Sequence, residues 1–309
     1  MQKIQEKTVI CKTHELLLFL ILRYGNGAIT LPQLRALALA LGLYSNAQAV
    51  NRAVRELRDA DVLERQTWVD NNSDLLLARK FALRYFSGKS SQEVATPQRP
   101  RTMAPYVQQS RKIDWLLSIM DKYHLTTTQG LNTFLRACGC TAFLRLPELP
   151  AYYRDHARIL AATNPENYRA QLARMEDNTP DKAPVITLEQ MHRRGIYISR
   201  IDSKKRAVWL LSFPGRDVHP GKVMDWTVDA CQWLISLLPY YHIYHYLQTL
   251  DKEHQETLKA ALLAIAPDTQ ATPYWLYRLE GAHLAGTVQI AVSNSDFIKN
   301  WCGNIRHVN

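Results

Sequence analysis

The stretch of sequence that decides the fold is residues 30–86, which read TLPQLRALALALGLYSNAQAVNRAVRELRDADVLERQTWVDNNSDLLLARKFALRYF. Thr30 and Gln33 have the spacing of a capping box, so we expect a helix to begin here. Pro32 is tolerated in the first turn of a helix and agrees with this assignment. Apolar residues then recur with helical spacing as far as Gly42, which we expect to end the helix in a left-handed conformation.

A second helix is expected over residues 46–60, with Ser45 as its cap. Its inward face consists of apolar residues, at Val50, Ala53, Val54 and Leu57. Its opposite face carries amide and guanidinium groups, at Gln48, Asn51, Arg52, Arg55 and Arg58. Amides pair with adenine edges, and guanidinium groups pair with guanine edges or phosphates. A solvated helix face has the same composition, so the helix alone leaves both interpretations open.

Two strand-like runs follow this helix and enclose a polar turn. Residues 63–69 and the beginning of residues 75–86 favour strands, and residues 70–73 have the composition of a turn. The second run carries basic side chains that suit phosphate contacts beside a recognition helix. With a further helix expected over residues 13–24, this is the order of parts in a winged helix-turn-helix. The predicted DNA contacts are Ser45, Asn46, Gln48, Asn51, Arg52, Arg55, Arg58, Arg79, Lys80 and Arg84.

The phrase AVNRAVRELRDADVLER, residues 49–65, resembles a passage found in many winged-helix regulators. It is also similar to the replication-relaxation family of mobile-element proteins. The resemblance covers residues 13–86, about a quarter of the 309-residue chain. It implies that double-stranded DNA is bound with one helix in the major groove.

Charge is distributed unevenly along the chain, which carries a net charge of +10. Residues 1–120 contain 17 Lys and Arg against 10 Asp and Glu, whereas residues 121–309 contain 21 against 18. The excess positive charge therefore lies in the part that resembles a DNA-binding module, and it suits a polyanionic partner. With 47% hydrophobic and 21% charged residues, the composition is that of a globular protein.

We expect an α+β protein in four parts. These are a winged helix-turn-helix over residues 1–86, a linker over 87–109, a helical segment over 110–176 and an α/β domain over 185–309. The pattern in the last part predicts strands over residues 195–201, 207–213, 243–247, 274–279 and 287–292. It predicts helices over residues 188–193, 224–238, 252–266 and 297–301.

The strand–turn–strand–helix order of this last part invites comparison with restriction-like nucleases. Such nucleases hold a metal with Asp on one strand and Glu-x-Lys on the next. Asp202 is present, but the following strand, residues 208–212, has no Glu-x-Lys pair. His242 and His245 have no acidic or thiol third ligand nearby in the sequence. We therefore expect no catalytic residues, no metal and no cofactor, and we interpret the aromatic residues 240–246 as a sheet face and edge.

The five cysteines have no zinc-ligand spacing and are expected to be reduced thiols in a cytoplasmic protein. The longest apolar run, residues 16–22, is too short to cross a membrane. We expect a sequence-specific transcriptional regulator that binds as a homodimer, because one winged helix covers only a half-site. The carboxy-terminal part would mediate assembly or sense a small-molecule or protein effector. The alternatives are an origin-binding replication or mobilisation protein of a plasmid, phage or mobile element, and a degenerate or unusual nuclease.

Overall fold

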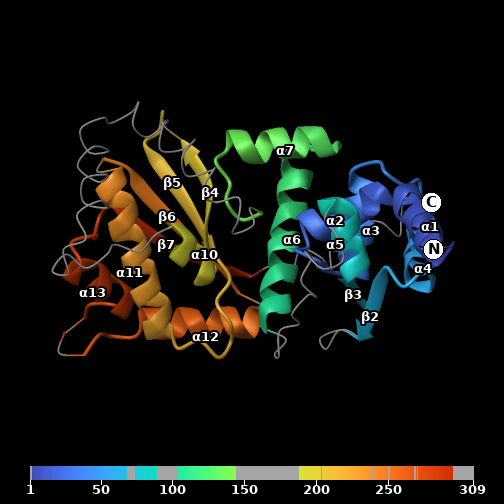
Figure 1. Ribbon diagram of the computed structural model, residues 1–309. Helices are drawn as coiled ribbons and strands as arrows, with labels where there is room; N and C mark the ends of the chain where they lie inside the picture. Colours follow the sequence, from blue (N-terminus) through green and yellow to red (C-terminus); the bar gives the residue numbers. More distant parts are fainter. Residues whose placement is uncertain are drawn as a thin grey trace, which may run out of the picture. The chain divides into compact units, whose positions relative to one another are not determined.

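The computed structural model describes residues 2–67, 74–88, 104–143 and 188–294, apart from residues 203, 239, 250, 268 and 270. Over these residues the protein is a mixed α+β structure with eleven helices and two sheets (Figure 1). The chain forms two compact units. Among the described residues, those up to Thr133 belong to unit 1, and those from Phe134 to Asn294 belong to unit 2.

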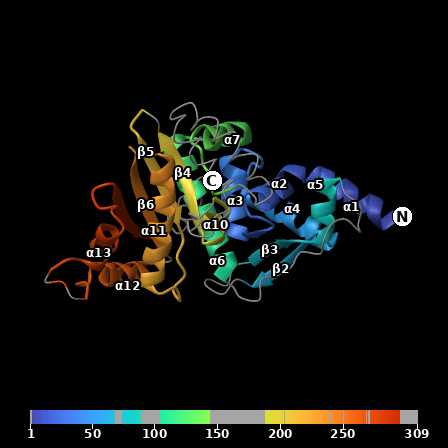
Figure 2. The same ribbon diagram turned by 60° about the vertical axis from the view of Figure 1, so that its left-hand side comes forward.

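Unit 1 combines short helices with a small antiparallel sheet. Its elements are α1 (Gln2–Thr13), α2 (Glu15–Arg23), β1 (Ala28–Thr30), α3 (Leu31–Ala40), α4 (Ala47–Asp59), β2 (Leu63–Thr67), β3 (Asp74–Ala78), α5 (Lys80–Ser87) and α6 (Ala104–Tyr123). Helix α7 (Thr128–Ala137) crosses the boundary between the units. Strands β2 and β3 follow α4 (Figure 2). The strand order is β1-β3-β2, so this hairpin is extended by the strand that precedes α3.

The predicted beginning and end of α3 are confirmed. The Gln33 amide donates to Thr30 Oγ1 at 3.4 Å, and the Thr30 amide donates to Gln33 Oε1 at 3.2 Å. Gly42 follows the helix with φ +63°, a conformation that strains any residue with a β-carbon. The beginning and the end of α3 are thus both determined by residues within or next to the helix.

The inward face of α4 is also confirmed, since Val50, Ala53, Val54 and Leu57 are buried. The predicted cap is wrong by one residue. Asn46, not Ser45, has the extended backbone of a cap, and its Oδ1 accepts from the Ala49 amide at 2.9 Å. The carboxamide oxygen of Asn46 therefore satisfies one of the unpaired amides at the start of the helix.

The helix predicted over residues 13–24 is in fact the second of two helices. The chain turns at His14, between α1 and α2, and α1 was not predicted. Leu16, near the start of α2, is 55% exposed, whereas Leu18 is buried. Helix α2 begins at Glu15, and its buried residues are Leu17, Leu18, Leu20 and Ile21.

The run over residues 75–86 begins as a strand, as predicted, and then continues as a helix. Strand β3 ends at Ala78, and residues 80–87 form α5 instead of continuing the strand. Ala82 is fully buried on α5, and Gly88 ends the helix with φ +64°. Arg79, Lys80 and Arg84 therefore lie at the start of α5 and within it, not on the hairpin.

Helix α6 begins at Ala104, earlier than the helical segment predicted from residue 110. Its Tyr106 and Val107 pack against Ala28, Leu75 and Leu77 of the small sheet. This helix thus completes the core of unit 1 over one face of β1 and β3. Most of the predicted linker and the predicted helices beyond residue 143 lie outside the described residues.

Unit 2 is built on a four-stranded sheet in the order β4-β5-β6-β7. Its elements are α10 (Leu188–Arg193), β4 (Ile196–Asp202), β5 (Ala207–Ser212), α11 (Pro220–Leu237), β6 (His242–Thr249), α12 (Lys252–Leu263), α13 (Tyr274–Gly281) and β7 (Val288–Asn294). Strands β4 and β5 form an antiparallel hairpin, and β5, β6 and β7 run parallel.

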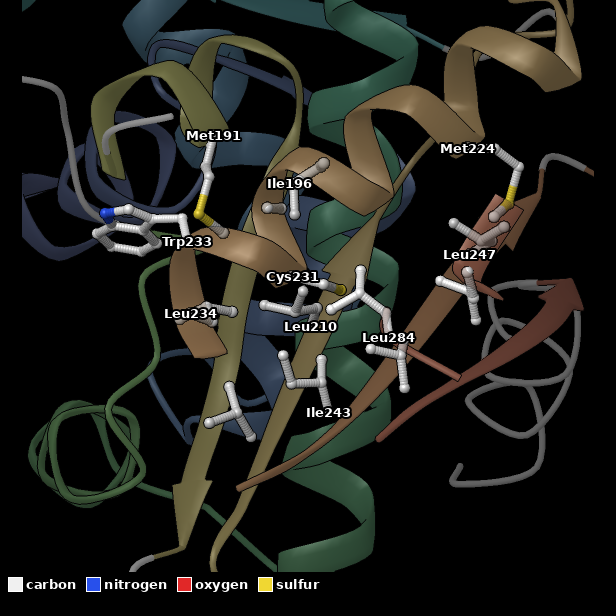
Figure 3. Packing of buried hydrophobic residues seen from close by; sticks show 14 of the residues in the cluster. Met191, Ile196, Leu210, Met224, Cys231, Trp233, Leu234, Ile243, Leu247 and Leu284 are labelled. Atoms are coloured by element: carbon white, nitrogen blue, oxygen red, sulfur yellow. The ribbon is translucent and has the colours of Figure 1, made fainter. Parts of the chain in front are cut away.

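Helices α10 to α13 contribute to one hydrophobic cluster on one face of this sheet. Figure 3 shows the part of the cluster to which α10 and α11 contribute. Met191 of α10 and Cys231 of α11 lie against Leu210 and Ile243 of the central strands. Leu279 of α13 belongs to the same cluster and is fully buried. Burial of this apolar surface is the main stabilising contribution available to unit 2.

Most of the elements predicted in unit 2 are confirmed, but the predicted strand over residues 274–279 is wrong. These residues form α13, which follows Pro273. Tyr274, Trp275 and Leu279 pack on the common cluster, and their spacing is that of a helix face. The predicted helix over residues 297–301 lies outside the described residues. Within the described part of the chain, no helix has both the length and the apolar character needed to cross a bilayer.

Candidate nucleic-acid interface

The outward face of α4 carries a stripe of polar and basic side chains held between two fixed edges. On one edge, Arg35 Nε of α3 donates to Asn51 Oδ1 at 2.7 Å. On the other edge, His14 Nε2 and Glu56 Oε2 are 2.8 Å apart. Exposed side chains at positions i, i+4 and i+7 lie between these edges, at Gln48, Arg52 and Arg55.

The arginines of α4 differ from those of the neighbouring hairpin in how they are paired. In the part of the chain that the structure describes, no carboxylate forms an ion pair with Arg52, Arg55 or Arg58. By contrast, Arg65 of β2 forms an ion pair with Asp74 of β3. The exposed face of α4 therefore presents guanidinium groups that can bind an external acceptor without first losing a partner.

His14 contacts both α4, through Glu56, and the turn before α4, through Tyr44. Its Nδ1 is 3.2 Å from the Tyr44 hydroxyl, in the turn that joins α3 to α4. His14 is 9% exposed, and burial followed by the nearby Glu56 carboxylate raises the pKa of Tyr44. These contacts fix the angle at which α4 leaves the turn. Sequence reasoning missed them, because Glu56 and His14 are far apart in the chain.

Two of the residues predicted to contact DNA, Ser45 and Asn46, are exposed at the amino-terminal end of α4. Asn46 uses its Oδ1 as the cap, and its Nδ2 donates to Ser45 Oγ at 3.3 Å. Backbone amides and the helix dipole make such an end favourable for a phosphate group. Asn46 accepts from only one amide of the first turn, so it can act as the cap while a phosphate contacts other groups at this end of the helix.

The three basic residues predicted on the hairpin occupy different environments on α5. Arg79 pairs with Asp61 and lies 3.4 Å from Glu64. The hydrogen bond from Lys7, at 3.1 Å, is the largest influence that lowers the pKa of Asp61. Arg84 lies over the ring of Phe81, on the same helix, and Lys80 is partly buried. Arg79 is thus already paired with carboxylates, unlike the arginines of α4.

Unit 2 places its candidate metal ligands apart from one another. Asp202 ends β4 and accepts from the Lys205 amide at 3.0 Å and from Arg200 Nη2 at 2.8 Å. The Lys205 amide is the largest influence that holds the pKa of Asp202 below its usual value. Among the described residues, no three His, Cys, Asp or Glu side chains are grouped so that they could hold a metal ion.

His242 and His245 lie on opposite faces of β6, because side chains alternate along a strand. His245 is buried, and its Nε2 is 2.9 Å from Ser212 Oγ of β5. Burial lowers the pKa of His245 to about 3, so this imidazole is neutral at physiological pH. The pair is therefore not arranged to bind one metal ion together.

Comparison with protein families, with curated proteins and with solved structures gives no match for this chain. The resemblance of residues 13–86 to winged-helix regulators stays a prediction from the sequence.

Proposed function

We propose that unit 1 is a winged helix-turn-helix that binds double-stranded DNA through α4. The observation that carries the proposal is the exposed stripe of Gln48, Arg52 and Arg55, whose arginines form no ion pair with any carboxylate among the described residues. Two hydrogen-bonded edges hold this stripe in place. An α-helix fits the major groove, and arginine pairs there with guanine O6 and N7. The order of α3, turn, α4 and hairpin supports the same proposal.

Different residues of α4 would carry different parts of recognition. Arg52, Arg55 and Gln48 lie on the stripe and would reach base edges. Arg58 lies one turn further on and would contact phosphate. Asn51 keeps its Nδ2 donor for a base, because Arg35 occupies only its Oδ1.

We propose further that the protein is a transcriptional regulator that binds a two-fold symmetric site as a homodimer. One recognition helix covers a half-site, and a second copy supplies the other half. Unit 2 would then serve assembly or respond to an effector, without catalysis. Footprinting on genomic DNA separates this role from origin binding by where the site lies. Magnesium-dependent cleavage that is lost in Asp202→Ala would instead support the nuclease alternative.

The DNA-binding proposal predicts that Arg55→Ala weakens binding to the preferred duplex by about 1–3 kcal/mol and relaxes base preference at one position. The preferred duplex is first obtained by selection from a random library, and affinity is then measured by fluorescence anisotropy. The control is Arg136→Ala, which removes an exposed arginine of α7 and should leave affinity unchanged. Equal losses for Arg55→Ala on the preferred duplex and on random duplexes would show that α4 contacts only phosphate.

A further inference from the structure

The sheet of unit 2 has a second face whose character differs from the buried one. Along β6, side chains alternate between exposed and buried positions, as expected for a strand with one open face. Ile243, His245 and Leu247 are buried, whereas Tyr244 is only partly buried and Tyr246 is 37% exposed. Two tyrosines of one strand thus point to the face opposite the hydrophobic cluster.

Parallel strands in proteins are usually covered on both faces. Here β5, β6 and β7 are parallel, and the helices α10 to α13 all contribute to the cluster on one face. The other face is open over β6 and β7, where His242, Tyr246 and Gln289 are exposed. A contiguous exposed patch that includes aromatic side chains is a better indication of an interaction surface than a single exposed ring.

A row of paired residues crosses this second face of the sheet, from β4 to β7. Arg200, Trp209, Tyr244 and Gln289 are neighbours in the register of β4, β5, β6 and β7. The rings of Trp209 and Tyr244 are stacked, with centroids 5.5 Å apart and planes 16° apart. The Arg200 guanidinium lies 5.0 Å from the centre of the Trp209 ring. The row is therefore a preformed stack of one cation and two aromatic rings.

The edge of the sheet beside this stack is basic. The turn between β4 and β5 exposes Lys204, Lys205 and Arg206. The carbonyl of Arg206 accepts from the amide of His242, so the turn adjoins the first residue of β6. Asp202, the acidic residue nearest the turn in sequence, is already paired with Arg200. A partner of this face is thus expected to carry negative charge and flat rings together.

We propose that this face of unit 2 binds single-stranded nucleic acid, with bases stacked on Tyr244 and Tyr246 and phosphates along the turn of residues 204–206. Aromatic side chains beside a basic track bind single strands in this way with little sequence preference. A duplex is a poorer partner, because its bases are already stacked on one another. Binding here does not depend on α4, so it is separate from the proposed duplex contact.

The test uses the full chain and fluorescein-labelled oligodeoxythymidine and oligouridine of about 15 nucleotides, with affinity measured by anisotropy. Tyr246→Leu should weaken binding about tenfold. The matched control is Tyr240→Leu, because Tyr240 is 73% exposed but precedes β6 and is not part of the sheet, whereas Tyr246 lies on β6. The two oligonucleotides distinguish a DNA partner from an RNA partner, and circular dichroism verifies that the variants are folded.

Arg55→Ala separates the two proposals, since it should weaken duplex binding and leave oligonucleotide binding unchanged. Equal oligonucleotide affinities for wild type, Tyr246→Leu and Tyr240→Leu would overturn the inference, as would a wild-type chain that binds neither oligonucleotide. Light scattering provides a second criterion. If Tyr246→Leu converts a dimer to a monomer, the face joins two copies of the chain, and the inference is wrong.

Discussion

Asp114 is a carboxyl group buried inside unit 1, at the point where α6 meets the beginning of α3. The Gln33 side-chain amide donates to Asp114 Oδ1 at 2.7 Å and to Ser110 Oγ at 2.7 Å. Burial raises the pKa of Asp114 to about 7, although the Gln33 hydrogen bond and the nearby Arg111 oppose this effect. A carboxyl group of this kind makes stability depend on pH near neutrality.

We predict that Asp114→Asn removes this dependence. Because the folded-state pKa is raised, the wild-type chain is most stable below the unfolded value of 3.8 and loses stability as pH rises to about 7. The difference between 3.8 and about 7 corresponds to about 4 kcal/mol in the free energy of unfolding. Urea unfolding at several pH values between about 3 and 8 would measure it, because the window includes both pKa values.

The control for this prediction is Asp121→Asn, which changes an exposed carboxyl group on the same helix. Its pH profile should follow that of the wild type. If Asp114→Asn and the wild type lose stability in parallel over the same pH range, then Asp114 ionises in the folded protein as readily as in the unfolded chain.

At the scale of the element, α4 depends on its cap and on two hydrogen bonds, one with Arg35 of α3 and one with His14. We predict that Asn46→Ala lowers the free energy of unfolding of unit 1 by about 1 kcal/mol, because one amide of the first turn loses its acceptor. Ser45→Ala should change it by much less, since Ser45 does not accept from the helix. Urea unfolding compares the two variants. A larger loss for Ser45→Ala would mean that Ser45 is the cap.

At the scale of the whole molecule, α6 extends the amino-terminal unit well beyond the hairpin. Tyr106 and Val107 cover Leu75 and Leu77, so a fragment that ends near residue 90 exposes part of the core. We predict that residues 1–137 fold alone, and that residues 1–90 are less stable by about 2 kcal/mol or more. Urea unfolding followed by circular dichroism measures the difference. The same midpoint for both fragments would show that α6 adds nothing to the stability of the unit.

Fragment 1–137 also tests the proposed assembly. If unit 2 joins two copies, the fragment should be monomeric by light scattering and should bind a symmetric duplex more weakly than the full chain, because linked half-sites bind in one intramolecular step. A monomeric full chain with the same affinity as the fragment would rule out this role for unit 2.

Local signals in the sequence were sufficient for the elements around α3 and α4. The Thr30–Gln33 capping box, the Gly42 stop and the buried face of α4 are each set within a few residues of the chain. Such features involve backbone hydrogen bonds and side-chain spacing inside one helix. They can therefore be predicted before the rest of the fold is known.

Only the tertiary structure decided which polar side chains of unit 1 are already used. The sequence placed Asn51, Arg55 and Arg79 in one group, but Arg79 is paired with Asp61, and Asn51 is bound by Arg35. The tertiary structure also distinguished α5 and α13 from strands. The sequence could not, because a short apolar run can pack either as a helix or as a strand. The physical reason is common to these cases. Ion pairs, stacked rings and buried faces join residues distant in the chain, and their geometry exists only after the core has formed.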